Sequence, residues 1–292
     1  MNRKSFAALA AGVVLAGGFA VIAAAPASAA QAVGAQAMAV LDATSVPAAA
    51  NAWYVDAKSG DVVVEVAKHT AGTAQFVAAA EATGAEVRAV VSRPYQQFYD
   101  VRGGDAWYTD SWRCSVGFSA TGPGGSKHFV TAGHCTGAPA STAYGYNRVS
   151  MGQVGGSVFG EAGDYGKVDV TSGEWNLRGV VVGAGGDVAV RGSAEAPIGA
   201  DICRSGSTTG WHCGVVQQKN VTVHYSDGSV VGGLTQTTVC AEPGDSGGSY
   251  ISGDQAQGVT SGGSGNCSSG GTTFFNPVNE ILGAYGLSLV TG

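Results

Sequence analysis

Short runs of Val, Thr and Ser that alternate with Gly-rich turns fill the chain after Pro94, and they constrain its fold most strongly. Runs of this length and composition predict β-strands. The expected strands cover residues 127–130, 165–170, 180–182, 188–190, 221–225, 230–239 and 249–251. Asp227 and Gly228 predict a hairpin between two of them. This pattern predicts an all-β domain, and its periodicity fits barrels or a sandwich equally.

One helix is expected near the end of this domain. Asn276 can cap it, Pro277 suits its first position, and Gly286 can end it after Tyr285.

Residues 30–98 have a different pattern and contain no cysteine. Two alternating runs within 53–66, around Ser59 and Gly60, predict a hairpin. Thr73 can cap a helix over 74–83 that Gly84 ends, and 86–91 alternates again as a strand. We expect a small α+β unit, which is short for a domain that is stable on its own.

Residues 1–29 have the form of a secretory signal. Basic residues precede an apolar stretch over 6–25, and Ala27, Ser28 and Ala29 form a small-x-small cleavage site. A membrane anchor is the alternative, because an apolar segment of about 20 residues can span a bilayer. The basic start and the cleavage site favour a removed signal, so we expect a secreted, extracellular protein that does not remain in the membrane.

The charge balance argues against one class of partner. The chain has 15 Lys and Arg against 21 Asp and Glu, a formal net charge of −6. An acidic chain without a basic patch is not suited to binding nucleic acid.

All six cysteines follow residue 113, and an even number in an exported chain indicates disulfides. Pairing neighbours in sequence is the simplest of the possible connectivities. A zinc site is the alternative, since His134 precedes Cys135 and His212 precedes Cys213. Adjacent strand residues point to opposite faces, so each pair is poorly placed to hold one ion. We expect no metal and no cofactor.

Two runs carry the candidate chemistry: TAGHC around His134 and GDSGG around Ser246. A serine hydroxyl is a weak nucleophile unless an imidazole accepts its proton, and this chain offers both groups. A buried carboxylate must hold the imidazole. Asp164 and Asp169 are candidates, and strand parity places Asp164 on the face of Val168 and Val170. We therefore predict that Asp164 is buried and that Asp169 is a solvated surface charge.

The glycines around Ser246 let the backbone turn tightly. They leave the N–H groups of Gly244 and Ser246 free to bind a developing oxyanion. Asp245 points away from the nucleophile and needs a counter-charge if it is buried.

With TAGHC, GDYG and CAEPGDSGG in this order, the chain resembles the chymotrypsin-like serine proteases, and within them the bacterial streptogrisin and α-lytic protease family. Residues 199–214, 255–267 and 285–292 extend the resemblance over essentially all of 99–292. It implies two antiparallel six-stranded β-barrels with the site between them. It also implies a buried Arg204–Asp245 pair. The implied disulfides are Cys114–Cys135, Cys203–Cys213 and Cys240–Cys267.

The resemblance further implies a substrate-binding edge at Ser261, Gly262 and Gly263, and a P1 pocket whose walls include Ala241, Thr260 and Thr272. We expect an open pocket for large apolar or aromatic residues. Glu242 lies at its rim, and the sequence assigns this carboxylate no role in specificity.

Residues 30–98 resemble the family's pro region, which assists folding and blocks the cleft as an intramolecular chaperone and inhibitor. The mature protein is then 99–292, a monomeric endopeptidase that acts on proteins or peptides. A secreted binding module without catalysis, or an esterase, remains the alternative.

Overall fold

The computed structural model describes residues 29–292 and divides between Tyr95 and Gln96 into two compact units. Residues 1–28 of the expected signal lie outside the described residues. None of the helices in the described part is long and apolar enough to cross a membrane.

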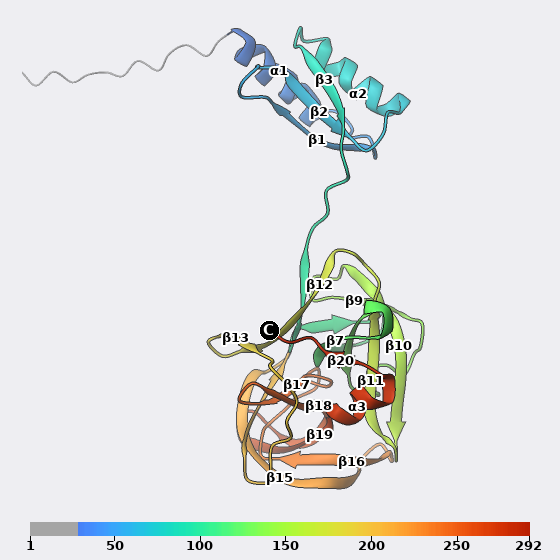
Figure 1. The fold of residues 1–292 in the computed structure, drawn as a ribbon, viewed down its shortest axis with the longest axis vertical. Helices are drawn as coiled ribbons and strands as arrows, with labels where there is room; N and C mark the ends of the chain where they lie inside the picture. The colour runs from blue at the N-terminus through green and yellow to red at the C-terminus, as the bar shows by residue number, and fades with distance from the viewer. Residues whose placement is uncertain (1–28) are drawn as a thin grey trace, which may run out of the picture. The chain divides into compact units, whose positions relative to one another are not determined.

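The N-terminal unit is a three-stranded sheet with two helices, shown in blue and cyan in Figure 1. Its elements are α1 (Ala29–Ala43), β1 (Ala50–Val55), β2 (Val62–Val66), α2 (Ala71–Glu81) and β3 (Val87–Val91). Strand β2 is central, antiparallel to β1 and parallel to β3. Leu41 of α1 and Phe76 of α2 pack in one core with Val62, Val64 and Val66 of β2. The expected α+β unit, its hairpin and its last strand are present.

Two details of this unit differ from the prediction. The cap of α2 is Thr70, not Thr73, because the two threonines bond reciprocally: the Thr73 N–H donates to Thr70 Oγ1, and the Thr70 N–H donates to Thr73 Oγ1. Helix α1 was not predicted. Its Ala-rich sequence shows little hydrophobic periodicity. Within residues 31–43, only Gly34, Ala37 and Leu41 are buried, so few positions carry the pattern of an amphipathic helix.

The second unit begins with an eight-stranded antiparallel sheet in the order β20-β7-β8-β11-β10-β9-β5-β6. Its strands are β5 (Ala106–Tyr108), β6 (Arg113–Ser115), β7 (Phe118–Thr121), β8 (Lys127–Thr131), β9 (Thr142–Tyr144), β10 (Ser150–Gly160), β11 (Gly163–Val170) and β20 (Ser288–Leu289). A closed six-stranded barrel was expected here, but these strands form an eight-stranded sheet whose hydrogen bonding does not close into a barrel. Strand β20 from the chain's end pairs with β7, and β5 meets β9 at one residue pair.

A smaller sheet joins β4 (Tyr99–Gly103), β12 (Trp175–Gly183) and β13 (Gly186–Ala189), with β4 parallel to β12. A 3₁₀ turn, η1 (Pro123–Gly125), links β7 to β8.

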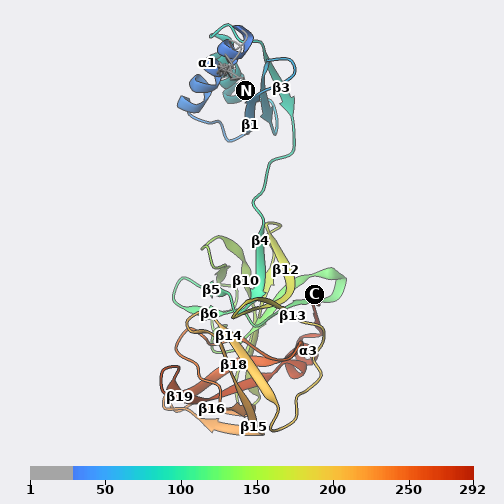
Figure 2. The same ribbon diagram turned by 90° about the vertical axis from the view of Figure 1, so that its left-hand side faces the viewer.

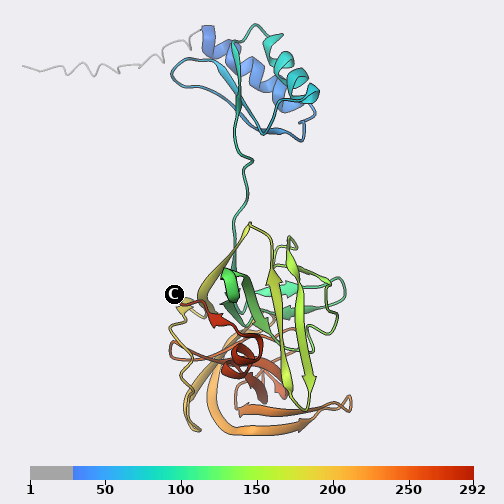
Figure 3. The ribbon, with the colours of Figure 1, turned by 45° about the vertical axis from the view of Figure 1, so that its right-hand side comes forward.

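The last part of the chain forms a closed six-stranded antiparallel barrel, as expected, in the order β14-β15-β16-β19-β18-β17 (Figure 2). Its strands are β14 (Asp201–Gly206), β15 (Gly210–His224), β16 (Val230–Thr237), β17 (Ser249–Ser252), β18 (Gln255–Asn266) and β19 (Gly270–Pro277). The predicted Asp227–Gly228 turn joins β15 to β16, with Gly228 at a φ of 89°. Figure 3 shows this long hairpin at the foot of the unit.

Helix α3 (Val278–Tyr285) ends at Gly286 as predicted, and Gly286 adopts the left-handed conformation. Its start differs from the prediction. Pro277 is the cap residue, and no side chain caps the helix. The Asn276 side chain instead accepts a hydrogen bond from the backbone of Asp164.

Candidate active site

His134 and Asp164 are paired in the structure. Nδ1 of His134 lies 2.8 Å from Oδ2 of Asp164, and Oδ1 of the same carboxylate accepts the His134 backbone N–H at 2.9 Å. The Asp164 side chain is fully buried, whereas the His134 side chain keeps 30% of its exposure. One oxygen of the carboxylate thus orients the ring and the other holds the backbone of the same residue, which leaves Nε2 for another partner.

The turn that carries His134 is held by its neighbours. His134 lies three residues beyond the end of β8. A Cβ on Gly133 would lie 1.8 Å from the carbonyl oxygen of Val158, so only glycine fits there. The Cys114–Cys135 disulfide ties the next residue to β6.

Asp164 is the second residue of β11 and lies on the buried face that strand parity predicts. Ser261 Oγ donates to its Oδ2 at 2.5 Å, and its backbone N–H donates to Asn276 Oδ1 at 2.8 Å. Gly163 permits the second contact, because a Cβ there would lie 2.5 Å from Asn276 Oδ1. No sequence pattern predicted the Asn276 contact, and Ser261 was predicted only as part of a substrate-binding edge.

The surroundings of His134 shift its proton affinity. Burial alone would lower the pKa of the imidazole. The hydrogen bond and charge of Asp164, with a smaller contribution from Asp227, outweigh burial and raise the pKa above its ordinary value. The carboxylate thus favours the imidazolium that forms when His134 accepts a proton.

The Gly244–Gly248 turn brings Ser246 close to the Cys114–Cys135 disulfide, which adjoins His134. The Ser246 carbonyl accepts the Ser115 N–H at 2.8 Å, next to the Cys114 disulfide, and the Gly247 N–H donates to Thr260 at 2.7 Å. Gly244 and Gly247 have φ angles of 98° and 78°. Within residues 29–292, the backbone N–H groups of Gly244 and Ser246 donate to no acceptor.

No hydrogen bond joins Ser246 Oγ to His134 Nε2 in the described part of the chain. Such bonds are often long without substrate and tighten only in the complex.

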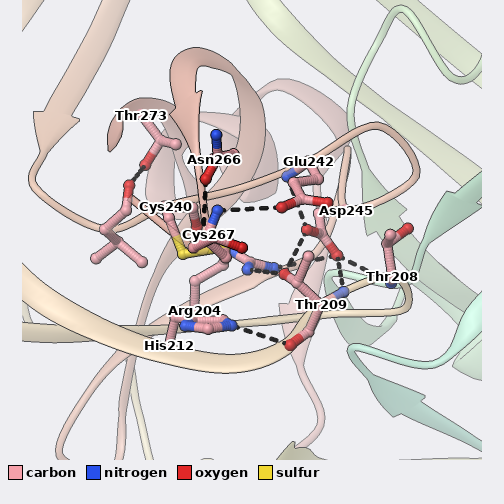
Figure 4. Close-up of a disulfide and its surroundings, with 12 residues drawn as sticks. Arg204, Thr208, Thr209, His212, Cys240, Glu242, Asp245, Asn266, Cys267 and Thr273 are labelled. Carbon is pink, nitrogen blue, oxygen red and sulfur yellow. Dashed lines mark hydrogen bonds and ion pairs between the residues drawn. A yellow bond between two sulfur atoms is a disulfide. The ribbon is translucent and has the colours of Figure 1, made fainter. Parts of the chain in front are cut away.

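Arg204 and Asp245 lie together, both fully buried, with Nη1 3.3 Å from Oδ1 (Figure 4). Asp245 also accepts the N–H groups of Thr208, Thr209 and Glu242 and the Thr209 hydroxyl. Burial would raise the pKa of Asp245, but the Arg204 charge and these hydrogen bonds outweigh it, and the net pKa is lowered. This cluster anchors the turn on which Ser246 lies.

A cavity of about 320 Å³ opens beside Ser246. It is lined by Ala241, Glu242, Pro243, Ser246, Thr260, Gly262, Gly263 and Gly265.

Two of the residues expected to bind substrate do not line this cavity. Thr272 is absent from its walls, and Ser261 lines a second cavity that lies beside His134. Glu242 Oε1 accepts the Cys267 N–H at 3.1 Å, so its carboxylate is engaged with the backbone (Figure 4).

The three implied disulfides are all present, and all cysteines are bonded. Histidines do lie close to cysteines: His134 near Cys114 and Cys135, and His212 near Cys240 and Cys267. Because these sulfurs are in disulfides, neither group offers the thiolates that a Cys-containing zinc site uses.

Asp169 is not the solvated charge that parity predicted. It is half-buried, its Oδ1 lies 2.8 Å from His128 Nδ1, and it also pairs with Lys167. This pair could not be predicted from the sequence, because β8 and β11 are far apart in the chain and only their register brings His128 opposite Asp169.

A closed antiparallel barrel beside an antiparallel sheet, with a buried His–Asp pair and a Gly-Asp-Ser-Gly-Gly turn, is the chymotrypsin-like architecture. Residues 101–284 match the family described as Trypsin, and residues 28–84 match the Alpha-lytic protease prodomain. The chain belongs to the trypsin family and carries a prodomain of the α-lytic protease type.

Proteins and solved structures that are similar to this chain are also proteases of this kind. Streptogrisin-C of Streptomyces griseus is 53% identical over 82% of this chain and 52% of its own length. Streptogrisin-D of the same organism is 43% identical over 81% of this chain and 60% of its own length. This chain thus spans between about half and three fifths of these relatives. The crystal structure of Cellulomonas bogoriensis chymotrypsin matches with a TM-score of 0.60 and 50% identity, covering 66% of this chain and 100% of that one.

Proposed function

We propose that this chain is the precursor of a secreted serine endopeptidase that cleaves peptide bonds through an acyl-enzyme on Ser246. The observation that carries the proposal is the fully buried Asp164 carboxylate, which holds His134 through both oxygens beside the Ser246 turn. The relatives named streptogrisin support it.

In the proposed reaction, Ser246 Oγ attacks the carbonyl carbon of the scissile bond while His134 Nε2 takes its proton. The oxyanion accepts hydrogen bonds from the N–H groups of Gly244 and Ser246, each worth about 3–4 kcal/mol in comparable enzymes. His134 returns the proton to the leaving amine as the C–N bond breaks. Water, deprotonated by His134, then attacks the acyl carbonyl, and Ser246 regains its proton.

We assign the P1 side chain to the cavity beside Ser246. Its walls are small at Ala241, Thr260, Gly262 and Gly263, so a large side chain fits. Among residues 29–292, Glu242 is the only acidic or basic residue that lines it, and its carboxylate accepts a hydrogen bond from the Cys267 N–H. The proposed preference is therefore Phe, Tyr, Leu or Met. The chymotrypsin named among the similar structures supports it.

The proposed precursor consists of a signal at 1–29, a pro region at 30–98 and the mature protease at 99–292. Phe98 is 74% exposed, whereas Tyr99 begins β4 and donates its N–H to the Glu174 carbonyl. Cleavage between them would leave the paired strand intact. Phe98 also suits the proposed P1 cavity, so we propose self-cleavage, after a period in which the pro region assists folding and blocks the cleft.

Casein digestion, a serine-directed phosphonate and a peptide library test this function together. The proposal predicts digestion, labelling of Ser246 and cleavage after large apolar residues. A binding module would neither digest nor label, an esterase would label without digesting casein, and cleavage after Lys or Arg would contradict the P1 assignment.

A further inference from the structure

A second cavity, of about 330 Å³, lies on the His134 side of the proposed substrate-binding edge. It is lined by His134, Phe159, Tyr225, Asp227, Ser261 and Gly262, among others. It shares Gly262 and Gly263 with the cavity assigned to P1. One short strand segment therefore borders both cavities.

This arrangement defines which substrate residue enters the second cavity, given the proposed function on which the inference rests. A peptide paired with the edge at Ser261–Gly263 is extended, and its successive side chains point to opposite sides. With P1 in the cavity beside Ser246, the preceding P2 side chain points toward His134 and Tyr225.

Asp227 makes this cavity acidic. Its Oδ1 accepts both the N–H and the hydroxyl of Ser229, which orients the carboxylate in the turn. Among residues 29–292, no Lys or Arg forms an ion pair with it, and none lines the cavity. Asp164 also lines the cavity, but its oxygens are taken by His134 and Ser261. Asp227 is thus the carboxylate left for a ligand.

The walls suit a long cationic side chain. Phe159 is 44% exposed, and its ring packs edge-on against His134 at 5.9 Å between centroids. The Tyr225 hydroxyl is bonded to Ser261 at 2.9 Å, which fixes its ring beside the cleft. Aromatic surfaces of this kind pack against the methylene stem of Lys or Arg and attract its charge.

We propose that this cavity selects Lys or Arg at P2, with Asp227 as the counter-charge and Phe159 and Tyr225 as the walls. The preferred substrates then carry a basic residue directly before a large apolar one.

The test compares Ala-Ala-Lys-Phe-p-nitroanilide with Ala-Ala-Met-Phe-p-nitroanilide, which differ at P2 in charge but little in length. We expect kcat/KM to be about two- to fivefold higher for the Lys peptide at low salt, the size of one exposed charge pair. The ratio should fall toward one in 1 M NaCl. In D227N it should also fall toward one, because Asn keeps the Oδ1 acceptor for Ser229 and removes only the charge. D227K should favour Glu at P2 over Gln.

D201N is the matched control, because Asp201 is an exposed carboxylate on β14 that lines neither cavity. Its Lys-to-Met ratio should equal that of the parent. A ratio near one in the parent, or an unchanged ratio in D227N, would overturn the inference while cleavage of the Met peptide still upheld the proposed function. If neither peptide is cleaved and Ser246 is not labelled, the proposed function itself fails.

Discussion

The Asp164 carboxylate holds His134 at two points: Oδ2 is 2.8 Å from Nδ1, and Oδ1 accepts the backbone N–H of the same residue at 2.9 Å. The ring can therefore rotate or change tautomer only by breaking a bond to a buried charge.

D164N should keep the fold and lower kcat by about 10⁴-fold, the size of the equivalent change in a Ser-His-Asp triad, because the amide favours the wrong imidazole tautomer. Kinetics on an Ala-Ala-Met-Phe substrate measures the effect. D169N is the control, since Asp169 pairs with His128 instead. Comparable losses in the two variants would refute the role of Asp164.

The pH dependence of kcat/KM should report His134. The imidazole accepts a proton only when neutral, and its pKa is raised. Activity should therefore rise with pH through a midpoint above about 6.5, the ordinary histidine value. D227N removes a charge that raises this pKa and should move the midpoint to lower pH, whereas D201N should not. A midpoint below the ordinary value would contradict this account.

Arg204 should be essential for stability because it compensates a buried charge. R204M leaves Asp245 buried without its partner and should cost about 3–5 kcal/mol in the free energy of unfolding. The double variant R204M/D245L should cost less. Urea unfolding in an S246A background, which prevents self-digestion, measures both. A single variant as stable as its parent would show that the pair is dispensable.

The same pair should make stability fall in acid. The folded-state pKa of Asp245 is lowered, so its contribution is complete above the unfolded value of about 3.9 and is lost as the pH falls through the folded value. The S246A protein should lose unfolding free energy more steeply below pH 4 than S246A/R204M/D245L. Equal slopes would contradict this linkage.

The pro region should be needed for folding but not for catalysis. Residues 99–292 are all-β, and both the first sheet and the barrel contain pairings between strands that are distant in the chain, such as β20 with β7 and β16 with β19, a kind of topology that folds slowly. Refolding of 99–292 should give activity when residues 30–98 are supplied and little without them. Rapid folding of 99–292 alone to active enzyme would refute the assistance.

Features encoded locally could be predicted from the sequence. Alternation placed Asp164 on the buried face of β11, and the Asp227–Gly228 turn appeared where two alternating runs meet. The disulfides and the Arg204–Asp245 pair followed from the family resemblance, and the structure contains both.

Features that depend on long-range register could not be predicted. Asn276 was interpreted as a helix cap because Pro277 follows it, yet its side chain bonds to Asp164, 112 positions earlier. The His128–Asp169 pair and the addition of β20 to the first sheet also depend on pairing between strands that are distant in the sequence. Local patterns report strand faces, but not which strands become neighbours.

Mass spectrometry of the enzyme after reaction with a diphenyl phosphonate that carries a Phe-like P1 group tests directly whether Ser246 is the nucleophile. We expect one adduct per molecule, on Ser246, and we expect it to form much more slowly in D164N but hardly more slowly in D169N. Casein digestion without an adduct, or with the adduct on another residue, would contradict the assignment of Ser246 as the nucleophile.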